Sequence, residues 1–127
     1  MAFGDVGGPV TELIITCCTP EHGAVALRKN DAVVMTGRRP YEVGHAALDG
    51  VPVFGQVLAD CDHNAAVIPV RVRGVLAFRY AGPAPLQGTL GLVVSAEEPG
   101  KVQVFTGSNR CWVCAVRKET RTVEVLL

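Results

Sequence analysis

The stretch VIPVRVRGVLAFRY, residues 67–80, carries the strongest structural signal in the chain. Apolar side chains recur at every second position from residue 70: Val70, Val72, Leu76, Phe78 and Tyr80. Arginines occupy alternate positions: Arg71, Arg73 and Arg79. A period of two is that of a β-strand, whose successive side chains point to opposite faces. Gly74 interrupts the pattern, and a glycine inside a strand often marks a bulge or bend. The stretch therefore predicts either two strands that turn a barrel corner or one long bent strand.

The rest of the sequence also has the pattern of short β-strands separated by turns. Its 14 glycines and 8 prolines fall at short intervals and separate short, Val-rich apolar runs, which is typical of an all-β sandwich or barrel. Further strands are predicted at Leu13–Cys18, Ala32–Thr36, Val53–Ala59, Gly91–Ser95, Lys101–Phe105, Cys111–Val116 and Thr122–Leu126. The one helical candidate, Tyr41–Leu48, is long enough for one or two turns and is weakened by Gly44. We expect a small single-domain β-barrel or β-sandwich, with a jelly roll among the options and little helix.

Composition limits the partners. The 127 residues suit one domain, and 12 Lys and Arg balance 12 Asp and Glu, so no global field attracts nucleic acid or anionic lipid. We therefore expect neither direct nucleic-acid binding nor a membrane partner. Residues 1–10, MAFGDVGGPV, contain four glycines or prolines and predict a flexible arm before a β domain at 11–127. They lack a basic segment and a long apolar run, so no signal peptide is expected.

The segment Cys111-Trp112-Val113-Cys114 has the spacing of a redox pair or of half a zinc site. A redox pair gains a low thiol pKa partly from a helix N-terminus, but the residues that follow, AVRKETRTVEVLL, predict strand, turn and strand. Residues three apart in a strand point to opposite faces. We therefore interpret Cys111 and Cys114 as strand cysteines that neither bridge nor share a metal.

Other chemical motifs are incomplete. Candidate zinc ligands are Cys17, Cys18, Cys61, His63, Cys111 and Cys114. Among them only the pair Cys111 and Cys114 has the two-residue gap of a zinc knuckle. The chain contains no G-x-S-x-G, and the calcium-loop pattern that begins at Asp60 fails at Ala65 and Arg71. His22, His45 and His63 are predicted to be solvated loop residues. The three arginines of 67–80 are interpreted as a solvated sheet face that could contact phosphate or an acidic protein surface. We expect no catalytic, metal or cofactor site.

Five segments, in this order, resemble a known family: KNDAVVMTG (29–37), GVPVFGQV (50–57), PVRVRGVL (69–76), EPGKVQV (98–104) and TVEVLL (122–127). They are similar to the small head decoration, or capsid cement, proteins of tailed bacteriophages. In that family a "GDAV-x-x-TG" strand, an "RG" strand and a "PG-x-V" turn recur before a "VEVLL"-like end. Asn30 stands where the family more often has glycine, and the Cys-Trp segment lies outside the pattern.

The resemblance implies a structural virion protein without enzymatic activity or cofactor. Such a protein sits on the outer surface of a capsid assembled in the host cytoplasm, bridges neighbouring major capsid proteins and stabilises the head, often as a homodimer or homotrimer. Candidate contacts are Phe3, Val6 and Val10 of the arm and Arg71, Arg73 and Arg79 of the sheet. Two alternatives remain: a small cupin-like or lipocalin-like barrel that binds a ligand or metal, and another phage component such as a head–tail joining or tail protein.

Overall fold

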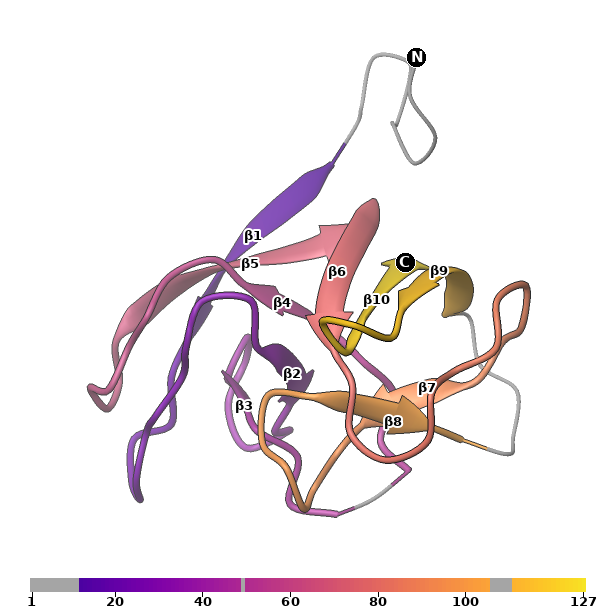
Figure 1. The fold of residues 1–127 in the computed structure, drawn as a ribbon. Coiled ribbons are helices and arrows are strands. Elements are labelled where there is room, and N and C mark those ends of the chain that lie inside the picture. The colour runs from indigo at the N-terminus through magenta and orange to yellow at the C-terminus, as the bar shows by residue number, and fades with distance from the viewer. Residues whose placement is uncertain (1–11, 49, 106–110) are drawn as a thin grey trace.

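The protein's structure, a computed structural model, describes residues 12–48, 50–105 and 111–127 (Figure 1). Within these residues it is all-β and contains no helix. The first five strands are β1 (Leu13–Cys18), β2 (Ala32–Met35), β3 (Val43–Gly44), β4 (Gly55–Val57) and β5 (Val67–Arg73). The other five are β6 (Val75–Arg79), β7 (Leu92–Val94), β8 (Val102–Val104), β9 (Trp112–Arg117) and β10 (Thr122–Leu126).

The largest sheet is antiparallel, has the strand order β1-β5-β4-β2-β3, and curls into a half-barrel (Figure 1). Its two outer strands approach each other at one end, where Cys18 forms a bridge with Glu42. The Cys18 amide donates to the Tyr41 carbonyl at 2.9 Å. This contact brings the end of β1 beside the start of β3, so the curl covers a core instead of leaving an open sheet.

Residues 67–80 form two strands that meet at Gly74. β5 belongs to the curled sheet, whereas β6 belongs to a three-stranded antiparallel sheet with the order β6-β10-β9. Gly74 has a φ of 121°, which a side chain rarely allows, and its amide and carbonyl both bond to Leu127, at 3.3 and 3.0 Å. Of the two arrangements predicted for this stretch, the corner is the one present.

The apolar side chains of residues 67–80 are buried, as predicted, but they enter two different core clusters. Val70 and Val72 pack inside the curled sheet with Cys17, Leu27, Val33, Val43, Val57 and Ile68. Leu76, Phe78 and Tyr80 pack in the second cluster with residues of β2, β7, β8, β9 and β10. Strand β2 lies between the clusters: Val33 joins the first, and Ala32 and Val34 join the second. Both faces of β2 are therefore covered, which explains its continuous apolar run.

The short β7–β8 hairpin connects to its surroundings through isolated bridges, Pro52 with Val93 and Tyr80 with Val102. A buried side chain gives a further link between sheets: Gln56 Nε2 on β4 donates to the Ala77 carbonyl on β6 at 2.6 Å. These contacts hold the three sheets against the second core cluster.

All eight predicted strand regions contain strands, but residues 41–48 were interpreted wrongly as a helical candidate. Val43 and Gly44 instead form β3, with Val34 opposite Gly44 and Met35 opposite Val43. Pairing with a buried strand overrides the local preference, because the pattern of residues 41–48 is too short to fix a helix by itself. The predicted arm, residues 1–10, lies outside the described residues. No helix in the described part of the chain is long and apolar enough to cross a membrane.

Candidate functional site

The three arginines of residues 67–80 do not form one cationic row. Arg71 lies 3.2 Å, Nε to Oε2, from Glu12, and Arg79 lies 3.0 Å, NH2 to Oδ1, from Asp31. Arg73 is exposed and has no ion pair with any described residue. Because the corner at Gly74 sends β5 and β6 into different sheets, Arg79 is separated from Arg71 and Arg73, and both Arg71 and Arg79 are neutralised locally. Of the candidate contacts in the arm, Phe3, Val6 and Val10 lie outside the described residues.

Cys111 and Cys114 point to opposite sides of their strand region, as the strand period predicted. Cys111 is buried in the second core cluster, and Cys114 is exposed. Burial raises the pKa of the Cys111 thiol to about 12, with a smaller contribution from Cys114. A thiol with so high a pKa is protonated at neutral pH and is a poor nucleophile. The spacing of this segment therefore does not produce a redox pair in the fold.

The other candidate metal ligands are dispersed. Cys17 is buried under the curled sheet and Cys61 packs at the edge of the same cluster, whereas Cys111 lies in the second cluster. His63 is exposed, with Nε2 3.5 Å from Asp62 Oδ1. Among residues 12–48, 50–105 and 111–127, no group of three or more His, Cys, Asp or Glu side chains is placed to hold a metal ion.

Asp31 organises a buried polar centre that the sequence did not reveal. Its side chain is 3% exposed and accepts hydrogen bonds from His45 Nε2, Arg79 NH2 and the Arg28 amide, each at 3.0 Å. Gly100 passes so close that a Cβ there would overlap the Asp31 carboxylate. His45 was expected to be a solvated loop residue; instead its side chain is 23% exposed and its ring is fixed by Asp31.

A second buried acid, Glu42, fixes the turn between β2 and β3. Its carboxylate accepts from Thr36 Oγ1 at 2.7 Å and from Arg39 Nε at 3.0 Å. Arg39 also donates to Glu21 and to the Thr19 carbonyl, both at 2.9 Å. The hydrogen bond from Thr36, followed by that from Arg39, lowers the pKa of Glu42 below its usual value. These contacts tie the β2–β3 turn to the end of β1.

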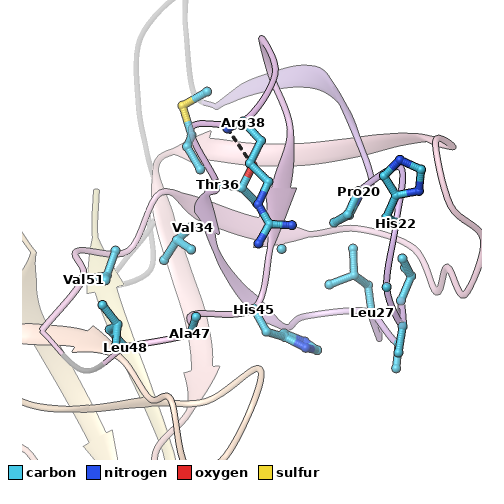
Figure 2. A pocket seen from close by; sticks show the side chains of 16 residues that line it. Pro20, His22, Leu27, Val34, Thr36, Arg38, His45, Ala47, Leu48 and Val51 are labelled. Atoms are coloured by element: carbon cyan, nitrogen blue, oxygen red, sulfur yellow. Dashed lines mark hydrogen bonds between the residues drawn. The ribbon is translucent and has the colours of Figure 1, made fainter.

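One cavity of about 430 Å³ opens beside β2 and β3 (Figure 2). One wall comes from Pro20 and residues 22–27, another from Val34 to Thr36 and Arg38, and the rest from Gly44, His45, Ala47, Leu48 and Val51. The apolar lining includes Leu27, Val34, Ala47, Leu48 and Val51. The polar lining among the described residues consists of His22, Thr36, Arg38 and His45, with no carboxylate. The volume lies in the usual range for small-molecule pockets.

The outer face of the β6-β10-β9 sheet carries a continuous apolar row. Leu126 lies opposite Val75 on one side and Trp112 on the other, and Trp112 forms a bridge with Leu90. Paired residues of antiparallel strands share a face. Trp112 is 47% exposed, Leu126 42% and Leu90 36%, and Val75 is partly exposed, while their neighbours Leu76, Val113 and Val125 are buried on the inner face. We call Val75, Leu126, Trp112 and Leu90 the apolar row.

Comparison of the sequence with protein-family models found no match, and comparison with curated proteins found no significant match.

Sequence reasoning missed the apolar row because Trp112 was considered only as part of the cysteine motif. It missed the cavity because Arg38 and His45 come together only through pairing of β2 with β3. One signal was present: the outward positions 75, 112 and 126 are apolar where a solvated face usually carries polar residues.

Proposed function

We propose that this protein is a structural component of a phage head that binds the outside of the assembled capsid and bridges adjacent major capsid proteins. The observation that carries the proposal is the apolar row. The row contains one side chain from each of β6, β10 and β9, together with Leu90, which forms a bridge with Trp112. These four apolar side chains lie side by side on one exposed sheet face. Contiguous exposed apolar surface is typical of a protein interaction site, and a partly exposed tryptophan is a common binding hot spot.

The rigid body and the resemblance support the same proposal. Three sheets enclose two adjacent core clusters, so the row is presented on packed strands and not on a loop. The turn and strand segments similar to decoration proteins include residues 69–76 and 122–127, which contribute Val75 and Leu126 to the row. Arg73 is exposed, precedes Val75 by two residues in the chain and forms no ion pair with a described residue, so its charge is available to an acidic rim on the partner.

Binding to the assembled shell but not to free subunits would stabilise the shell by mass action. At a free concentration of 100 times the Kd, each occupied site contributes about 2.7 kcal/mol. Repetition over many sites makes strong individual contacts unnecessary. Self-association of the decoration protein as a dimer or trimer at local symmetry axes would add avidity. The proposed location is therefore the outer surface of the virion head.

The test is co-sedimentation of purified protein with empty assembled capsids and, separately, with tails from the same particle. Trp112→Ala should weaken capsid binding at least about tenfold, because hot-spot tryptophans usually contribute more than this. Val67→Ala is the matched control: Val67 is also exposed, but it lies at the far end of β5 from the Gly74 corner. Circular dichroism checks that both variants fold.

The outcomes separate the candidates. Capsid binding that Trp112→Ala weakens and Val67→Ala leaves intact supports the proposal. Binding to tails alone would identify a tail or joining component, and equal effects of the two substitutions would remove the apolar row from the interface.

A further inference from the structure

We propose that the cavity beside β2 and β3 binds a small hydroxy-carboxylic acid with an apolar chain. Arg38 would hold the carboxylate, His45 would accept a hydrogen bond from the hydroxyl, and the apolar wall would bury the chain. This inference does not depend on the proposed binding to capsids, because the apolar row lies on another sheet.

Arg38 lines the cavity, and its side chain forms no ion pair or hydrogen bond with a described residue. Its charge acts on the Glu42 carboxylate, which Thr36 and Arg39 already hold and which does not line the cavity. Every other arginine that the structure describes, except Arg73, contacts a carboxylate, a carbonyl or an aromatic ring. The Arg38 amide donates to Thr36 Oγ1 at 3.3 Å, and Figure 2 shows its side chain extending over the cavity. No described lining residue carries a carboxylate. A guanidinium with free donors suits a carboxylate, which it can bind with two parallel hydrogen bonds.

His45 provides a second polar group with a fixed role. Its Nε2 lies 3.0 Å from Asp31 Oδ2, and a carboxylate accepts, so Nε2 donates. In the neutral ring Nδ1 is then an acceptor, and it has no hydrogen-bond partner among the described residues. Asp31 is itself held by Arg79 and the Arg28 amide, so the imidazole orientation is determined by buried contacts. A ligand that complements this nitrogen carries a hydrogen-bond donor such as a hydroxyl.

The rest of the cavity is suited to a hydrocarbon chain. Leu27, Val34, Ala47 and Leu48 line it (Figure 2). A volume of about 430 Å³ accommodates a molecule of roughly ten heavy atoms with room to spare. A cation and a hydrogen-bond acceptor among mostly apolar lining residues select a ligand that has a polar end and an apolar end.

The experiment is NMR titration of the full chain with three eight-carbon probes. 3-Hydroxyoctanoate has both polar groups, octanoate lacks the hydroxyl, and octane-1,3-diol lacks the charge. We expect saturable shifts of the Leu27, Val34 and Leu48 methyl signals, with 3-hydroxyoctanoate the tightest and each of the other probes about tenfold weaker. Arg38→Gln should reduce 3-hydroxyoctanoate affinity to that of the diol. Arg73→Gln, the other unpaired arginine, should change none of the three.

Three results would overturn the inference. Equal affinity for all three probes would show that the cavity selects only for apolar character. Equal affinity for octanoate and 3-hydroxyoctanoate would show that His45 does not recognise the hydroxyl, and hydroxy acids would then not be the ligand class. An equal loss in Arg38→Gln and Arg73→Gln would show attraction by overall charge. Since capsid co-sedimentation is measured separately, either proposal can fail while the other stands.

Discussion

Asp31 shows how one buried carboxylate can hold distant segments together. It joins the turn before β2, the end of β6 and the segment after β3 through Arg28, Arg79 and His45. Asp31→Ala should lower the free energy of unfolding by about 3 kcal/mol, because it leaves buried donors without an acceptor. Urea denaturation measures this loss. Asp62→Ala, at an exposed carboxylate paired only with exposed His63, should stay within about 0.5 kcal/mol of the parent protein. A similar small effect at Asp31 would contradict its central role.

Glu42 gives the protein a pH dependence with a defined sign. Hydrogen bonds from Thr36 and Arg39 lower its pKa in the folded state, so the folded protein binds this proton less readily than the unfolded chain. The resulting stability is fully present above the ordinary glutamate pKa of about 4.3 and is lost as the pH falls through the lower folded value.

Glu42→Gln should therefore destabilise the protein at pH 7, and the difference from the parent should shrink as the pH falls below about 4. Thermal melts between pH 3 and 7 measure it. Glu98→Gln is the control: the hydrogen bond from Lys101 lowers the pKa of Glu98, but both groups are partly exposed to solvent, so its effect should be small. A difference for Glu42→Gln that stays constant with pH would contradict the assignment.

The two cysteines at β9, Cys114 within the strand and Cys111 just before it, should differ in reactivity because they point to opposite sides of the strand region. Cys114 is exposed, whereas Cys111 is buried with a pKa raised to about 12. Alkylation of the native protein with iodoacetamide at pH 7.5, followed by peptide mass spectrometry, should modify Cys114 and leave Cys111 unmodified until the protein is denatured. Replacing both by Ser should retain capsid binding, with a packing loss at position 111. Equal rates at the two thiols in the native state would show that the segment opens.

Strands were predictable from sequence where a local period of two coincided with burial on one face. Residues 67–80 revealed their buried positions in this way, and Gly74 marked the corner. β3 was not predictable, because its two residues become a strand only by pairing with β2. The same limit applies to the cavity: His45 and Asp31 lie 14 residues apart, and nothing local indicates that they meet. The separation of Arg71 from Arg79 likewise required knowing that β5 and β6 enter different sheets.

At the scale of the whole fold, the two candidate binding surfaces among the described residues are distinct. The apolar row lies on the outer face of the β6-β10-β9 sheet, and the cavity (Figure 2) lies beside β2 and β3 of the curled sheet; Figure 1 shows where these strands lie. Strand β2 contributes to both core clusters, so the sheets that carry the two surfaces share packed side chains. A packed β body with an exposed apolar row is consistent with the proposed function of binding a neighbouring protein. Equal numbers of acidic and basic residues give the protein no net charge for long-range attraction, so the proposed binding depends on short-range contacts.

The most direct measurement is a cryo-electron microscopy reconstruction of purified heads that contain this protein. The proposed function predicts density for the β body on the outer capsid surface, across the boundary between major capsid proteins. Val75, Leu126 and Trp112 should be buried against the shell. Complete heads without this density, or a bound protein whose apolar row faces solvent, would contradict it.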